Sequence, residues 1–338
     1  MAHSRTSRRI TGLVALGAAA VVGLTGACSP GQAAGTVAAR AAAPAAAAGS
    51  PIDMTSGFYV DPDSNPAKWV RDNPGDARAA RIKSAIADKP TAGWFGDWSG
   101  DIGTAVSAYV GAADAADKLP VLVAYNIPGR DCSGESKGGS DKDKYEGWIS
   151  AFAGAIGSRP AVVVIEPDAL AQLDCLPADT DRQFRLDLLK FATEQFKAKA
   201  PNTWAYLDAG NAKWIAPDVM AQRLESAGVH NVRGFAVNVS NYYTTDESES
   251  YGTAVNASLS SKVPFIVDTS RNGNGSKNGE WCNPAGRKLG VTPQVGGGAE
   301  MLLWVKVPGD SDGSCGIGQG IPAGQFSPDL ATHLIDGS

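Results

Sequence analysis

Short apolar segments rich in β-branched residues recur along the chain and alternate with longer segments in which apolar residues repeat at helical spacing. The apolar segments predict strands at 57–60, 92–95, 120–125, 161–165, 203–207, 232–237, 264–267 and 301–305. Residues 180–200 give the clearest helical pattern, because Phe184, Leu188 and Phe191 fall on one face. The repeated order of strand and helix predicts an α/β fold built on a parallel sheet.

About eight strand–helix units suit a parallel sheet closed into a TIM-like (β/α) barrel. An open, doubly wound sheet is the alternative, but no glycine-rich phosphate loop follows the first predicted strand. Two long segments, 129–142 and 271–300, interrupt the repeat, and each is rich in glycine and contains a cysteine. Long irregular segments in a compact domain usually carry function, so we expect both near the site.

The N-terminal segment, residues 1–28, has the pattern of an export signal. Its arginines come before a run of uncharged apolar residues that is short for a membrane span. The run ends in small residues and Cys28, which resembles a bacterial lipoprotein cleavage site, and ordinary cleavage a few residues later is the alternative. Residues 29–50 are almost all Ala, Gly and Pro and predict a linker before the domain at 51–338. We expect an extracellular protein, either secreted or held at the cell surface by a lipid on Cys28.

Charge and histidine content exclude several classes of function. The chain of 338 residues carries a formal net charge of -5, and its first 49 residues contain four arginines and no acid, so the remainder is distinctly acidic. That balance argues against nucleic acid as a partner. With only His3, His230 and His333, a zinc site built on several histidines is excluded, and a Ser-His-Asp triad would need one of the last two. We expect a monomer that uses no metal and no other cofactor.

Four cysteines remain when Cys28 of the leader is set aside: Cys132, Cys175, Cys282 and Cys315. Export permits disulfides, and four cysteines allow three pairings. Pairing of sequence neighbours, Cys132 with Cys175 and Cys282 with Cys315, is the simplest of the three.

Aspartates stand just after most of the predicted strands: Asp61, Asp97, Asp131, Asp168, Asp208, Asp268, Asp310 and Asp312. In a parallel barrel these strand ends share one face, where catalytic groups gather. Helix N-capping is the alternative role, above all for Asp61 and Asp97. Five tryptophans lie at strand ends or in the adjoining loops: Trp94, Trp98, Trp214, Trp281 and Trp304. A place in the core suits Trp304, which lies inside an apolar strand. Aromatic rings suit stacking on sugars, and glycoside hydrolysis needs two carboxyl groups, so the pattern points to that reaction.

Two segments closely resemble the signatures of glycoside hydrolase family 6, the cellulases. Residues 123–132 are Val-Ala-Tyr-Asn-Ile-Pro-Gly-Arg-Asp-Cys, and residues 164–170 are Val-Ile-Glu-Pro-Asp-Ala-Leu. Further segments agree with the family in the same order, at 206–210, 268–273, 280–282 and 303–313. The likeness extends from about residue 51 to residue 338, so the domain is identified as a glycoside hydrolase catalytic domain.

The resemblance implies a distorted barrel with about seven parallel strands, and hydrolysis of β-1,4-glucan with inversion at the anomeric carbon. Asp168 then corresponds to the general acid, and Asp131 to the carboxyl that raises the pKa of the acid and helps to relay the proton of the attacking water. Asp312 corresponds to the proposed base, with Lys306 and Arg271 as its charge partners. Inversion requires the acid and base carboxyl groups to lie about 6.5–9.5 Å apart, which leaves room for the water.

Other positions are implied to contact the glucan: Tyr125, Trp94, Asp208, Asn211, Trp214, Asn238, Arg271, Trp281, Lys306, Asp310 and Ser136. The family also implies the neighbour pairing of the cysteines given above. Three positions depart from the family pattern. Asn211 stands where His is frequent, Asp310 stands where Glu is frequent, and Lys137 stands in a segment that prefers small residues.

The mode of cleavage follows from the lengths of two segments. Residues 271–282 form a short segment and only 23 residues follow Cys315, which leaves little chain to roof the site. We therefore expect an open cleft and an endoglucanase. A cellobiohydrolase, which releases cellobiose from chain ends, is the alternative within the family. A non-catalytic glucan-binding lipoprotein is the alternative from another class, and the presence of both Asp131 and Asp168 argues against it.

Overall fold

The computed structural model describes residues 49–132 and 134–338. The compact unit that contains them spans Ala47–Ser338. The predicted export signal, Cys28 and nearly all of the predicted linker lie outside the described residues. Within the described ranges, no helix combines the length and the apolar character that crossing a membrane requires.

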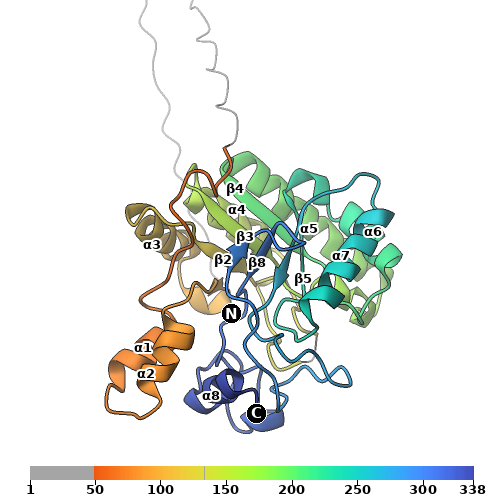
Figure 1. Ribbon diagram of the computed structural model, residues 1–338. Helices are drawn as coiled ribbons and strands as arrows, with labels where there is room; N and C mark the ends of the chain where they lie inside the picture. Colours follow the sequence, from red (N-terminus) through yellow and green to blue (C-terminus); the bar gives the residue numbers. More distant parts are fainter. Residues whose placement is uncertain (1–48, 133) are drawn as a thin grey trace, which may run out of the picture. The chain divides into compact units, whose positions relative to one another are not determined.

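One curled sheet of eight strands forms the centre of this unit (Figure 1). The strands are β1 (Gly93–Phe95), β2 (Val121–Ala124), β3 (Ala161–Ile165), β4 (Thr203–Asp208), β5 (Gly234–Val237), β6 (Phe265–Asp268), β7 (Gln294–Val295) and β8 (Met301–Leu303). Their order is β1-β2-β3-β4-β5-β6-β8-β7, in which all neighbours run parallel except β7, which is antiparallel to β8. The Ala92 N–H donates to the Trp304 carbonyl oxygen at 3.0 Å, so the segments flanking β1 and β8 meet. The predicted α/β fold, a distorted barrel with about seven parallel strands, is confirmed.

Both faces of the parallel sheet are buried, as is usual when helices cover the strands. In β3, Val162 and Val164 belong to the apolar cluster inside the curl of the sheet. Val163 and Ile165, which alternate with them, belong to the larger cluster between the sheet and the helices. This two-sided burial explains why the strands appear in the sequence as continuous apolar runs rather than as alternating ones.

Helices follow most of the strands and pack on the outer face of the sheet (Figure 1). They are α3 (Ile102–Ala115), α4 (Tyr145–Ile156), α5 (Asp179–Lys199), α6 (Pro217–Ser226) and α7 (Thr245–Ser258). Three further helices, α1 (Asn65–Asp72), α2 (Ala79–Ile82) and α8 (Pro328–Asp336), stand apart from this layer, and Ile82 and Ala331 share a small cluster between α2 and α8. The helix predicted at 180–200 is α5, shifted by one residue.

Two predicted strands differ in the structure. Residues 57–60 form only an isolated bridge, in which Phe58 pairs with Leu119, so this segment is not a strand of the sheet. The strand predicted at 301–305 ends at Leu303, because the next backbone N–H groups, those of Val305 and Lys306, donate to the Asp268 carboxylate instead of a neighbouring strand. The sequence analysis also missed β7, which is two exposed residues long and has no apolar run to announce it.

The predicted cysteine pairing is confirmed, because Cys132 is bonded to Cys175 and Cys282 to Cys315. The pairs are separated by 43 and 33 residues in the sequence. Loops of that length correspond to a stabilisation of about 4 kcal/mol per bridge through the entropy of the unfolded chain. Each bridge ties one of the two long irregular segments to the carboxyl end of the barrel.

Candidate active site

The predicted aspartates gather at the carboxyl ends of the parallel strands. Asp208 and Asp268 are the last residues of β4 and β6, Asp131 and Asp168 follow β2 and β3, and Asp312 follows β8. The charges of Asp208, Asp131 and Asp312 all act on the Asp168 carboxyl, so these four groups share one site. The prediction that strand ends bring carboxylates together therefore holds for residues that are more than a hundred positions apart.

The two turns that carry the acids are joined through Glu166, a residue without a predicted role. Its buried carboxylate accepts the N–H groups of Asn126 and Ile127 at 2.8 and 2.9 Å and the Tyr145 hydroxyl at 2.9 Å. Burial raises the pKa of Glu166 to about 7, although these donors act in the opposite direction. Glu166 has a φ of 49° and Asp168 one of 70°, a left-handed backbone that costs energy in residues other than glycine. The turn after β3 is held in this form by the surrounding contacts.

Asp168 has the properties of a carboxyl group that keeps its proton. Its side chain is partly exposed at the residue level, and its backbone N–H donates to Asp208 Oδ1 at 2.9 Å. Burial, followed by the charges of Asp208 and Asp131, raises the pKa of Asp168 well above its ordinary value. Asp208 itself is buried, and burial raises its pKa to about 7. In this structure Asp208 therefore acts on Asp168, since it has little surface with which to contact a substrate.

Asp131 is aimed by two donors from different segments. Its Oδ2 accepts the Ser136 N–H at 2.7 Å, and its Oδ1 accepts the side-chain amide of Gln172 at 3.1 Å. Ser136 thus contacts the site through its backbone. The neighbouring Cys132–Cys175 bridge fixes the base of this segment.

Asp312 is a buried carboxylate that is held in its ionised form. Its Oδ2 accepts hydrogen bonds from Arg271 at 2.8 Å, Tyr242 at 3.0 Å and the Asn283 N–H at 3.1 Å. Its Oδ1 lies 3.2 Å from Lys306 Nζ. Burial alone would raise its pKa, but the two cations and these donors outweigh burial, so the pKa of Asp312 lies below its ordinary value.

Two members of the predicted set are structural in this arrangement. Asp268 is fully buried and accepts the backbone N–H groups that follow β5, β6 and β8, those of Ser240, Ser270, Val305 and Lys306. Asn238 is also fully buried, and its amide is saturated by the backbone of Tyr243 and Asp268. Both side chains lock neighbouring turns together and cannot touch a substrate in this structure. Asn211 is buried too, and its Oδ1 accepts the Lys213 N–H at 3.2 Å.

Aromatic side chains line the space beside the acids. Trp94 donates its indole N–H to the Val305 carbonyl oxygen at 2.8 Å and meets Tyr125 edge to face, with ring centroids 5.3 Å apart. Both rings line a pocket of about 820 Å³ that also includes Lys306 and Asp310. Trp214 and Trp281, in the segments after β4 and β6, are exposed by 40% and 47%. Trp214 and Trp281 therefore present exposed ring surface, whereas Trp94 is partly buried and packs against the apolar cluster inside the sheet.

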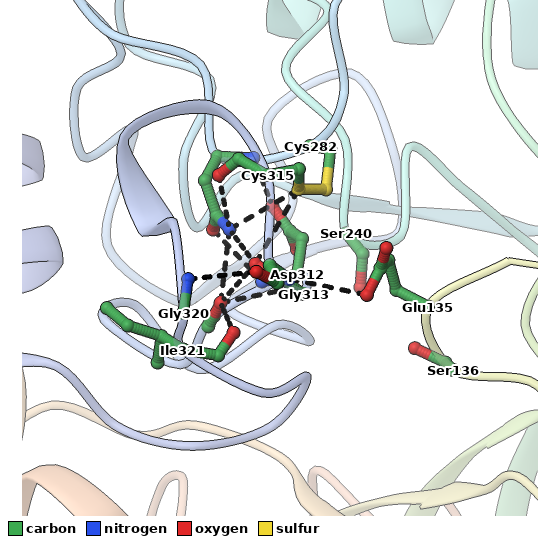
Figure 2. The surroundings of a disulfide bond; sticks show 12 residues. Glu135, Ser136, Ser240, Cys282, Asp312, Gly313, Cys315, Gly320 and Ile321 are labelled. Atoms are coloured by element: carbon green, nitrogen blue, oxygen red, sulfur yellow. Dashed lines mark hydrogen bonds between the residues drawn. A yellow bond between two sulfur atoms is a disulfide. The ribbon is translucent and has the colours of Figure 1, made fainter.

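The segments that follow β2 and β8 contact each other next to the second disulfide. Figure 2 shows Glu135, from the segment after β2, reaching toward Gly313 in the segment after β8. Its Oε2 accepts the Ser314 N–H at 3.3 Å. Gly313 has a φ of 139°, and a Cβ there would lie 2.4 Å from Glu135 Cγ, so glycine is required for this approach.

Comparison with known proteins matches this site to a family. The model of the glycosyl hydrolases family 6 matches residues 54–338. The chain belongs to glycoside hydrolase family 6. It is 56% identical to Endoglucanase 1 of Streptomyces halstedii over 88% of this chain and 94% of that protein. It is 43% identical to Endoglucanase A of Cellulomonas fimi over 83% of this chain, and there it spans only 61% of the relative.

A solved structure gives the same result. The endoglucanase Cel6 of Mycobacterium tuberculosis, in complex with methyl-cellobiosyl-4-deoxy-4-thio-beta-D-cellobioside, superposes with a TM-score of 0.78. The two sequences are 40% identical, and the match covers 86% of this chain and 99% of the other. The resemblance that the motifs indicated is confirmed, and this family 6 chain is a glycoside hydrolase.

Several residues of this family 6 site had no role in the sequence analysis. Glu166, Gln172, Tyr242 and Asn283 each hold a carboxylate or a turn of the site. Glu166 could have been noticed within the Val-Ile-Glu-Pro-Asp segment, whereas the others stand outside the motifs that carry charge. Asp61 and Asp97 are not helix N-caps; Asp101 caps α3, and Asp97 pairs with Arg130 at 3.1 Å. Among the described residues, no group of three or more potential ligands could hold a metal ion.

The effect of the Asp208 charge on the pKa of Asp168 can be tested by mutation. Asp168 is the predicted general acid, and a general acid works only while protonated, so activity is expected to fall as the pH rises through its pKa. Asp208→Asn keeps an oxygen for the Asp168 N–H but removes a negative charge that raises the pKa of Asp168. The basic limb of the pH–kcat/KM profile should therefore move to lower pH. Asp187→Asn, on the exposed face of α5, serves as the control and should leave the limb in place. A basic limb that does not move in Asp208→Asn would show that Asp208 does not help Asp168 to hold its proton.

Proposed function

We propose that this protein is an endo-β-1,4-glucanase that hydrolyses cellulose or related β-1,4-glucans with inversion of anomeric configuration. The observation that carries the proposal is the division of charge among the carboxyl groups at the strand ends. The pKa of Asp168 is raised well above its ordinary value, whereas that of the neighbouring Asp312 lies below its ordinary value. Asp168 thus favours its protonated form, and Asp312 favours its ionised form. Glycoside hydrolysis by inversion needs one carboxyl group of each kind.

In the proposed reaction, Asp168 gives its proton to the glycosidic oxygen while the bond from that oxygen to the anomeric carbon breaks. The electron pair of the bond stays with the oxygen, which leaves as the hydroxyl of the departing glucan. Water attacks the anomeric carbon from the opposite face and gives a proton to a carboxylate of the enzyme. Asp168 ends as a carboxylate, and the enzyme takes up the proton that the water loses. The total number of protons on the enzyme is therefore unchanged.

We assign the proton of the water to Asp131 and Asp312 acting in sequence. Asp131 is the better exposed of the two, and its oxygens are aimed by Ser136 and Gln172. Asp312 is a weak base, because Arg271 and Lys306 stabilise its charge. The same two cations lower the pKa of Asp312, so there is a pH range in which Asp312 is ionised while Asp168 is protonated. Asp312 is thus the proposed final base, with Asp131 as the relay.

The remaining predicted residues form the proposed glucan-binding surface. Trp94 and Tyr125 lie next to each other at the acids, and Lys306 and Asp310 line the same pocket. Trp214 and Trp281 offer exposed rings on other segments of the rim. Sugar rings have apolar faces that suit these aromatics, and their hydroxyls suit the charged groups. Asn211 and Ser136 also belong to the predicted set; Asn211 is buried, and Ser136 lines the pocket.

Endo cleavage is supported by the relatives, since those with 40% identity or more are named endoglucanases. More distant relatives include a probable cellobiohydrolase of Aspergillus clavatus, at 28% identity, so exo cleavage is the alternative within the family. Glucan binding without catalysis does not require a carboxyl group with a raised pKa, such as that of Asp168. The raised pKa of Asp168 and the family membership both favour an enzyme.

The two disulfides are typical of proteins that work in an oxidising compartment, which agrees with an extracellular enzyme. Attachment of a lipid at Cys28 stays a prediction from the sequence, and so does the monomeric state.

Replacement of the acid should affect substrates according to their leaving groups. General acid catalysis is worth about 10²–10⁴-fold, so Asp168→Ala should lose activity on cellulose by that factor. An aryl cellobioside with an acidic phenol leaves without protonation, so its hydrolysis should fall far less. Initial rates on the two substrates measure the difference, with Asp187→Ala as the matched control. Equal losses on both substrates would contradict the assignment of Asp168 as the acid.

The mode of cleavage can be determined from the way in which the enzyme hydrolyses carboxymethyl cellulose. Internal cuts shorten the chains at once, so viscosity should fall steeply while few reducing ends have appeared. Viscometry and a reducing-sugar assay on the same sample give this ratio. Release of reducing ends with a nearly constant viscosity would establish exo cleavage, and the absence of any reducing ends would leave only glucan binding.

A further inference from the structure

The pocket beside the acids is larger than the predicted subsites occupy. It measures about 820 Å³, which is within the range of ligand sites in proteins. Besides Tyr125, Lys306 and Trp94, its lining includes the segment 59–68 and one face of α3. The part lined by that segment and by α3, called the outer part below, has no role in the site described above.

At the inner end of this space, Asp310 has an unused acceptor. Its Oδ2 accepts the side-chain amide of Asn65, on α1, at 2.9 Å. Its Oδ1 is buried and has no hydrogen-bond partner among the described residues. Asp310 lines the pocket, and a buried acceptor without a partner is costly unless a ligand supplies a donor. A sugar hydroxyl is such a donor.

At the rim of the outer part, Trp98 presents a fixed aromatic surface. It is exposed by 56%, more than any other tryptophan among the described residues. The Arg130 guanidinium lies 5.0 Å from the centroid of the Trp98 ring and 5.0 Å from that of Tyr125, and it is anchored by Asp97 at 3.1 Å. The exposed ring is therefore connected to the tyrosine at the acids through one rigid guanidinium.

The outer part of the pocket is lined by small residues of α3 and by charged residues of the segment 59–68. Ala105, Ala108 and Ala112 fall on one face of α3, where their small side chains leave the floor open. Opposite them, Asp61 is half-buried, and Lys68 is an exposed residue of α1 that makes no ion pair in the described part of the chain. Both groups share the lining of the pocket with Trp98. A carboxylate, an ammonium group and an aromatic ring in one pocket match the hydroxyls and the apolar face of a pyranose.

We propose that this outer pocket binds one further glucosyl residue of the β-1,4-glucan chain, beyond the residue at Trp94. Trp98 stacks on this sugar, and Asp61 and Lys68 hydrogen-bond its hydroxyls. The inference rests on the proposed glucanase function and extends it, because it predicts that the enzyme selects longer chains through contacts remote from the acids.

The test compares oligosaccharides from cellotriose to cellohexaose. For the wild-type enzyme, kcat/KM should rise about tenfold when the chain first reaches the outer pocket, since one added stacking and hydrogen-bonding group is worth roughly that factor. Ala108→Trp fills the floor and should abolish this rise. Ala115→Trp, at an exposed position of the same helix outside the pocket, should retain it. Should Ala108→Trp not fold, Lys68→Ala tests the same ratio and should reduce the rise roughly threefold or more.

The readout is the ratio of kcat/KM for the long and the short substrate, so a general loss of activity does not imitate the effect. A wild-type ratio near one, or equal ratios in Ala108→Trp and Ala115→Trp, would overturn the outer subsite while the glucanase function stood. A wild-type enzyme that cleaves none of the oligosaccharides would overturn the proposed function itself.

Discussion

The crowding of buried carboxyl groups at the carboxyl ends of the strands is the constraint on which the rest of the site depends. Like charges in a poorly solvated space disfavour joint ionisation, so the group gains stability when one member keeps its proton and another is paired with cations. Asp168 is the member whose pKa is raised well above its ordinary value, and Asp312 is the one paired with Arg271 and Lys306. An acid and a carboxylate therefore coexist at one pH without a histidine or a metal ligand set among the described residues.

The fold maintains this arrangement through contacts that are themselves polar and buried. Glu166 joins the turns after β2 and β3, and Asp268 joins those after β5, β6 and β8. The two disulfides fix the long segments from which Asp131 and the partners of Asp312 come. The catalytic geometry is thus built from several strand ends, and each is tied to a neighbour by a carboxylate that accepts backbone N–H groups.

Much of this architecture could be predicted, because parallel strands with two buried faces give continuous apolar runs and their ends are marked by aspartates. The motifs around Asp131 and Asp168 then identified the family, and the neighbour pairing of the cysteines was correct. The sequence could not show that Asp268, among the aspartates at strand ends, and Asn238, among the predicted glucan contacts, are fully buried and structural. Their burial and saturation depend on backbone groups far away in the chain. The stacking of Arg130 between Trp98 and Tyr125 is hidden for the same reason.

The stereochemistry of the first product tests the central claim most directly, because the claim places an acid on one face of the scissile bond and the water with its proton acceptors on the other. Proton NMR of a β-linked cello-oligosaccharide, recorded immediately after addition of enzyme, separates the two anomers before mutarotation mixes them. The account predicts that the α-anomer appears first. Initial accumulation of the β-anomer would show retention, and it would contradict both the water-side role of Asp131 and the assignment of Asp312 as the base.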